Sequence, residues 1–144
     1  MKKILTCLLA AITLAACSHS VQSESIPFEV AHNYFVRNDV SSVPVKINSQ
    51  EAFERCFGMA AFMGRNGQPT PIDFSRQFVI AIVLPETAHS TEIAAERLTQ
   101  EGNDLVLTYQ VSVAEKENTW TQVPQLLLIV NRDYERDSVI LKAE

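Results

Sequence analysis

Two segments of this chain are apolar at every position, Phe78–Leu84 (FVIAIVL) and Leu126–Val130 (LLLIV). A β-strand with one face in water alternates apolar and polar residues, whereas a strand covered on both faces does not. We therefore predict that Phe78–Leu84 is a central strand buried on both faces, and that Leu126–Val130 is a second buried strand. A sheet that contains such strands must be covered by other elements of the fold on both faces.

Alternating residues predict a hairpin between these two segments. Leu105–Val113 (LVLTYQVSV) alternates over its whole length, and the turn Glu101–Asp104 before it favours pairing with Thr91–Thr99. The residues expected to point inward are Leu105, Leu107, Tyr109, Val111 and Val113, and those expected to point outward are Thr108, Gln110 and Ser112.

Three weaker patterns predict further strands. Ile26–Val36 (IPFEVAHNYFV) reads as one strand, and Val43–Ile47 (VPVKI) as a short one whose proline favours a sheet edge or a strand start. Ser138–Leu141 would form a last strand after the charged turn Asn131–Asp137. The expected inward face of the first strand carries Phe28, Val30, His32, Tyr34 and Val36.

One helix is predicted, beginning at Asn48 or Ser49 as its cap and continuing through Gly58. Its apolar face is expected to lie on the sheet and carries Phe53, Cys56, Phe57 and Ala60. The predicted fold class is therefore mainly β (α+β). It is an antiparallel sheet sandwich or half-barrel with one covering helix, formed by a single domain over residues 26–144.

The first seventeen residues have the features of a bacterial lipoprotein signal. Lys2 and Lys3 precede an apolar stretch, Ile4–Leu14, that is too short to cross a bilayer. The segment ends in Leu-Ala-Ala-Cys, which is typical of a lipobox. We predict that residues 1–16 are a signal peptide and that Cys17 is acylated. The lipid on Cys17 would then anchor the chain to a membrane, because two or three acyl chains suffice for stable attachment.

The residues after Cys17 predict a tether and a location. Residues 17–25 are expected to form a flexible lipidated segment, since SHSVQSES is polar and has no periodicity. Ser18 stands where an aspartate would retain a lipoprotein in the inner membrane of Gram-negative bacteria, so the outer membrane of the cell envelope is favoured.

Signal removal changes the charge and the cysteine count. The net charge moves from −5 to −7, because loss of Lys2 and Lys3 leaves ten Lys and Arg against seventeen Asp and Glu. An acidic chain without a basic cluster is not expected to bind nucleic acid. Cys56 remains as the only ordinary thiol, so the hydrophobic core must hold the domain together without a disulfide.

No pattern in the chain predicts catalysis, a cofactor or a metal site. Cys56 with His32 or His89 as a base is the obvious nucleophile, but its place on the apolar helix face favours a small buried hydrophobe. The three histidines lack metal-ligand spacing, and the acidic residues of Asn131–Asp137 fit a charged turn better than a calcium loop. The chain is therefore not expected to be an enzyme.

Two segments between strands are candidate partner-binding loops, residues 85–91 (PETAHST) and residues 115–121 (EKENTWT). Trp120 would anchor a partner from an exposed loop end, or would start the next strand and pack into the core, and the pattern favours the core. The residues singled out in the two loops are Ala88, His89, Ser90, Thr91, Asn118 and Trp120.

Three stretches, Ile47–Phe57 (INSQEAFERCF), Pro71–Ser75 (PIDFS) and Gln77–Leu84 (QFVIAIVL), together resemble the C-terminal domain of PrcB-type protease-complex lipoproteins. Gln122–Pro124 (QVP) is similar to the late glutamine–proline step of that family, and the likeness spans about residues 44–130. The resemblance implies a non-catalytic lipoprotein that assembles with, or stabilises, an exported protease.

The family usually has a Gly-Gly-Tyr turn where this chain has Ala88–Thr91 (AHST). That turn is also similar to the loop with which chagasin-type inhibitors enter cysteine-protease clefts. Two hypotheses follow for the chain. One is an envelope-anchored binding or assembly module for another envelope protein, and the other is a protease inhibitor that uses residues 85–91 and 115–121.

Overall fold

The computed structural model describes residues 23–144. The predicted signal peptide, residues 1–16, and the predicted lipidation site, Cys17, lie outside these residues. Residues 23–25 at the end of the predicted tether are exposed and belong to no helix or strand. A search of the described part of the chain for a helix long and apolar enough to cross a membrane finds none.

The two apolar runs form the centre of a four-stranded sheet, as predicted. β5 (Gln77–Val83) and β8 (Gln125–Asn131) pair antiparallel along their whole length. β1 (Phe28–Val30) lies outside β8, and β3 (Lys46–Ile47) lies outside β5, which gives the order β1-β8-β5-β3. Side chains on both faces of the central pair are buried, so the predicted burial on both faces is confirmed.

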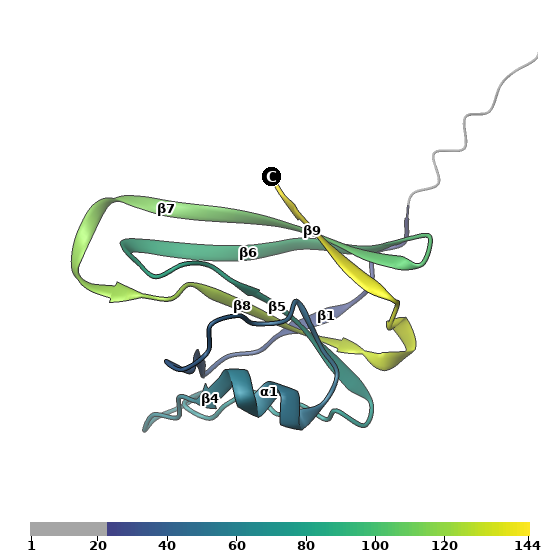
Figure 1. The fold of residues 1–144 in the computed structure, drawn as a ribbon, viewed down its shortest axis with the longest axis horizontal. Coiled ribbons are helices and arrows are strands. Elements are labelled where there is room, and N and C mark those ends of the chain that lie inside the picture. The colour runs from purple at the N-terminus through teal and green to yellow at the C-terminus, as the bar shows by residue number, and fades with distance from the viewer. Residues whose placement is uncertain (1–22) are drawn as a thin grey trace, which may run out of the picture.

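A second sheet covers one face of this sheet (Figure 1). β6 (Thr87–Glu101) and β7 (Asp104–Gln122) form the predicted hairpin around Gly102, whose φ of 62° suits glycine. β9 (Ser138–Ala143) joins the other edge of β7 in parallel. The core between the sheets contains Ile80, Ile82 and Leu128 from one sheet, and Leu98 and Leu107 from the other.

The opposite face of the central sheet is covered by α1 (Gln50–Cys56) and a small two-stranded sheet of β2 (Tyr34–Val36) and β4 (Phe57–Met59). The hydroxyl of Ser49 accepts a hydrogen bond from the Ala52 amide, as expected of a helix cap. The helix ends at Cys56, earlier than predicted, because Phe57 has extended backbone angles and begins β4. The expected mainly β (α+β) fold with one covering helix is confirmed.

This covering layer is held by aromatic packing. Phe53 stacks on Phe57 with ring centroids 5.0 Å apart, and it meets Tyr34 edge to face at 5.1 Å. The same layer buries Cys56 together with Ala81 and other residues of the central sheet. The prediction that Cys56 is a buried hydrophobe on the helix face is therefore confirmed.

The predicted first strand, Ile26–Val36, is wrong as a single element. It breaks between β1 and β2, which belong to different sheets. The cause is Asn33, whose φ of 64° turns the chain, and whose side-chain amide donates to the carbonyls of Asn66 and Gln68 at 2.7 and 2.8 Å. His32 is consequently exposed and does not point inward.

The predicted faces of β7 hold only for its first part. Leu105 and Leu107 are fully buried, but Val111 and Val113 are exposed, because β7 continues past Tyr109, the last of its residues that packs against the core. Thr108, expected to face outward, is also buried. It lies in the middle strand of its sheet, between the longer side chains Arg97 and Lys142 in the register.

Replacing Phe57 with alanine tests the covering layer. We expect the free energy of unfolding to fall by about 3–5 kcal/mol, as for other buried aromatic residues, because the change leaves a cavity beneath α1. Urea unfolding followed by circular dichroism measures this loss. Phe62→Ala is the matched control, since Phe62 is exposed, and its effect should stay within about 0.5 kcal/mol. Equal stability of both variants would show that Phe57 does not pack as described.

Candidate functional site

The two segments predicted to be binding loops are neighbouring parts of one ribbon. Residues 87–91 lie in β6 and residues 115–121 lie in β7, so the prediction of loops there is wrong. The cause is continued pairing. The Leu84 amide donates to the Pro124 carbonyl at 2.9 Å, and this bond links the β5–β8 pair to the β6–β7 pair. The structure therefore brings the two predicted segments together.

The ribbon reverses direction at this point, and we call residues 86–91 with residues 113–122 the bend (Figure 1). Between the pairs Thr87–Gln122 and Thr91–Val113, β7 advances nine residues while β6 advances four. In a half-turn within the plane of a ribbon, the outer strand travels further by π times the strand separation. With strands about 4.8 Å apart this is about 15 Å, or about four to five extended residues. The five extra residues of β7 match this path.

His89 fastens the outer strand of the bend to the inner one. Its Nδ1 lies 3.0 Å from the carbonyl oxygen of Ala114, so Nδ1 carries the proton in this contact. Its Nε2 lies 3.6 Å from the carboxylate of Glu117. The imidazole is thus held by two groups on β7, and its position is that of a structural clamp within the bend.

Gln122 and Thr121 close the bend on the opposite side. The side-chain amide of Gln122 donates to the carbonyls of His89 and Thr91, both at 3.2 Å. The hydroxyl of Thr121 donates to the carboxylate of Glu86. These side-chain bonds cross the region where the strand register shifts twice, between Thr87 and Thr91, so the bend is a defined structure.

The other residues predicted for this site lie on the same bend. Ser90 is exposed, while Ala88 and Asn118 are half-buried. Trp120 is 55% exposed, so the favoured expectation that it packs into the core is wrong. The reason is that β8 begins only at Gln125, after Pro124, and Trp120 belongs to the lengthened outer strand. Val111 and Val113 nearby are 37% and 59% exposed.

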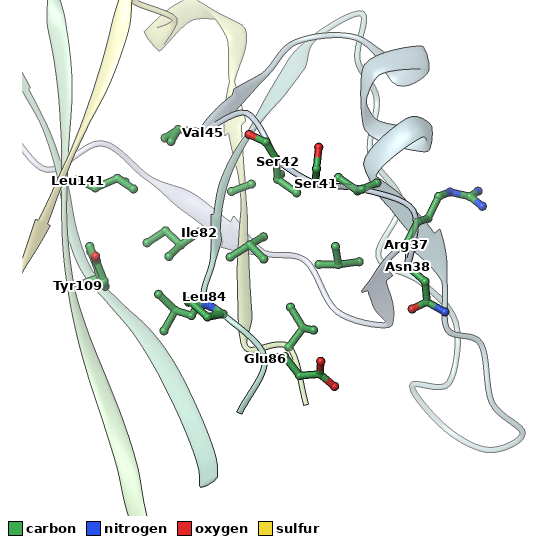
Figure 2. A pocket seen from close by; sticks show the side chains of 17 residues that line it. Arg37, Asn38, Ser41, Ser42, Val45, Ile82, Leu84, Glu86, Tyr109 and Leu141 are labelled. Carbon is green, nitrogen blue, oxygen red and sulfur yellow. The ribbon is translucent and has the colours of Figure 1, made fainter. Parts of the chain in front are cut away.

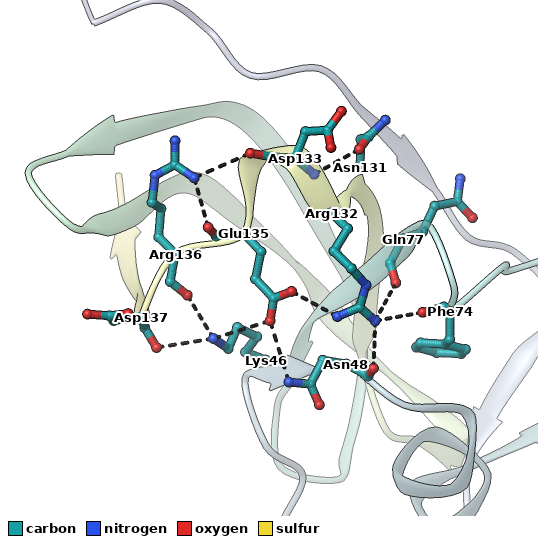
Figure 3. Close-up of polar contacts among 10 residues, drawn as sticks. All are labelled: Lys46, Asn48, Phe74, Gln77, Asn131, Arg132, Asp133, Glu135, Arg136 and Asp137. Atoms are coloured by element: carbon teal, nitrogen blue, oxygen red, sulfur yellow. Dashed lines mark hydrogen bonds and ion pairs between the residues drawn. The ribbon is translucent and has the colours of Figure 1, made fainter.

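The charged turn 131–137 has a structural role (Figure 3). The guanidinium of Arg132 donates to the carbonyls of Phe74 and Asn48 at 2.6 and 2.8 Å, and to the carboxylate of Glu135 at 2.9 Å. Lys46 also reaches Glu135, at 3.7 Å. The turn therefore ties the end of β8 to the start of α1. No group of three potential metal-ligating side chains occurs in the part of the chain that the structure describes.

Comparison of the chain with protein-family models, with curated proteins and with solved structures finds no match. The likeness to PrcB-type lipoproteins stays a prediction. The structure does show what two residues of the resembling motifs do. Gln122 closes the bend, and Asp73 caps the turn that leads into β5, accepting from the amide and hydroxyl of Ser75 at 3.0 and 2.6 Å. The Ser75 hydroxyl and the Arg76 guanidinium hold the pKa of the Asp73 carboxyl below its usual value.

Removing the Gln122 side chain tests how the bend is held. We expect Gln122→Ala to lower the free energy of unfolding by about 1–2 kcal/mol, because the Thr91 carbonyl loses the Gln122 amide and the His89 carbonyl keeps only the Thr91 hydroxyl as a side-chain donor. It should also speed hydrogen exchange of amides 87–91 and 113–121, measured by mass spectrometry. Gln110→Ala is the matched control, since this exposed glutamine lies on the same strand outside the bend. If both variants exchange alike at the bend, Gln122 does not hold it.

Proposed function

We propose that this protein is an envelope-anchored lipoprotein that binds another exported protein through the outer strand of the bend. The observation that carries the proposal is the exposure of Trp120 and Val113 on a ribbon fixed by side-chain hydrogen bonds. Exposed tryptophan on a rigid support is typical of binding hot spots, since little conformational freedom is lost when a partner buries it.

The charges around the bend favour a basic partner surface. Glu86, Glu115 and Glu117 are exposed there, and Lys116 is the single basic residue between Ser112 and Gln122. The mature chain would carry a net charge of −7 once the signal is removed. An acidic rim around an apolar anchor steers association toward positively charged partners.

The proposed lipid on Cys17 limits where that partner can be. Nine residues, 17–25, separate the acylated end from Ile26, which is the first buried residue of the described chain. Nine extended residues reach at most about 30 Å. A domain held that close to a bilayer meets proteins of the same membrane surface, and the family resemblance suggests an envelope protease among them.

The bend favours a binding or assembly module over a chagasin-like inhibitor. An inhibitor of that kind inserts separate loops into a cleft. Here residues 87–91 and 115–121 belong to the paired strands β6 and β7, with His89 opposite Glu117. The broad paired surface is better suited to contact across an interface.

Trp120→Ala tests the binding surface. A photo-reactive residue at position 113 would be used to cross-link the protein in its native envelope, and the products identified by mass spectrometry. We expect one recurrent cross-linked partner of the unmodified protein. The affinity of that partner for Trp120→Ala should be about 30-fold lower, as for loss of a hot spot of about 2 kcal/mol. Phe62→Ala, an exposed aromatic outside the bend, should leave it unchanged. Identical products and affinities for both variants would rule out Trp120 as the anchor.

Cys17→Ser tests the proposed anchor separately. We expect the variant to leave the membrane fraction while its thermal unfolding stays the same, because the described elements begin at Phe28. Membrane fractionation and circular dichroism measure the two effects. Continued residence of the variant in the membrane, after washing with high salt, would contradict lipidation at Cys17.

A further inference from the structure

One edge of β5 is left without a partner near its end. β3 pairs with β5 at Ile47–Val79 and Lys46–Ile80, and the Ala81 amide donates to the Val45 carbonyl at 2.8 Å. Upstream of Val45 the chain turns away, while β5 continues to Val83. Within residues 23–144, no strand therefore pairs with the last part of β5 on the side away from β8.

The hydrogen-bond pattern shows which groups face this opening. The Leu84 amide points to β8, because it donates to Pro124, and the Ala81 amide points to β3. Successive residues of a strand alternate in this respect. Val83 lies two residues after Ala81, so its N–H and C=O point away from β8. Within residues 23–144 neither group has a backbone partner on that side.

Val83, which carries this N–H and C=O, lines a cavity of about 810 Å³ (Figure 2). One wall is apolar, formed by Ile82 of β5 and the following Leu84 with Tyr109 and Leu141 of the second sheet. The rim is polar and includes the hydroxyls of Ser41 and Ser42 and the carboxylate of Glu86. Glu86 accepts one hydrogen bond, from Thr121, and a carboxylate has room for more.

We propose that this groove is a second binding site, which adjoins the bend and shares Glu86 with it, and which takes an extended peptide segment of a partner protein as an added strand. The segment would run antiparallel to β5 along the line of β3 and pair with the N–H and C=O of Val83. Residues beside the paired one would place their side chains on the Ile82 and Leu84 face, toward Tyr109. Strand addition of this kind uses backbone bonds for affinity and pockets for specificity.

The unpaired backbone groups of Val83 and the charge of Glu86 favour a peptide over a fatty acyl chain in the groove. A fatty acyl chain would fill the apolar wall but leave the N–H and C=O of Val83 buried without partners, which is costly. A peptide strand supplies both bonds. Pro85 has no N–H, so the ladder ends there, and the N-terminal end of the segment lies near Glu86. A basic residue at that end would complement the carboxylate and the net negative charge of the chain.

The test uses the full-length protein in nanodiscs and a labelled probe peptide, Lys-Thr-Val-Thr-Val-Thr, with binding followed by fluorescence anisotropy. We expect saturable binding at millimolar or lower concentration. Single N-methylation should weaken binding about fivefold or more at the one residue that pairs with Val83, and it should have little effect at that residue's two neighbours, whose amides face away from β5. Equal effects at all positions, or no binding up to about 5 mM, would overturn the proposal.

Substitutions in the protein test whether the peptide binds in the groove. Glu86→Gln should weaken binding of the lysine peptide several-fold, while Glu92→Gln, an exposed change elsewhere on β6, should not. Trp120→Ala should leave peptide affinity unchanged, which separates this site from the bend. Amides around Val83 should gain protection from hydrogen exchange on binding. Protection by laurate and not by the peptide would show a lipid site and overturn the peptide proposal.

Discussion

The pairing of β5 with β8 is the constraint on which the rest of this structure depends. Side chains on both faces of this pair are apolar, so neither face can meet water without losing the burial that stabilises the fold. One face is covered by the β6–β7–β9 sheet and the other by α1 with β2 and β4. The three layers follow from this need, and the Arg132 contacts then join the end of β8 to the residues before α1 and before β5.

The same pair also produces the bend. Its hydrogen-bond ladder does not end at Val83 but passes through Leu84 and Pro124 into β6 and β7, which fold back over the central sheet. A ribbon that turns back within its own plane needs a longer outer strand. The extra residues of β7 meet this need, and they have no apolar layer above them. The exposure of Trp120 is therefore a direct consequence of how the sandwich closes.

Sequence patterns predicted the elements whose signals are local. The apolar runs identified β5 and β8, the turn before Leu105 identified the hairpin, and the predicted cap at Asn48 or Ser49 identified the start of α1. The patterns failed where a distant contact decides the outcome. Asn33 breaks the first strand because residues 66 and 68 hold its side chain. Trp120 and Val113 were misplaced because alternation along one strand does not show where the layer packed against its face ends.

The bend and the groove share a boundary, and this suggests how they act together. Glu86 accepts a hydrogen bond from the outer strand of the bend and also lines the groove beside β5. A partner that contacts Trp120 would bring its neighbouring segments to the open edge at a high effective concentration, so even a weak strand addition would add to affinity. The proposed lipid on Cys17 would raise the local concentration of the first contact in the same way. Modest individual contacts would then suffice for stable assembly at the membrane surface.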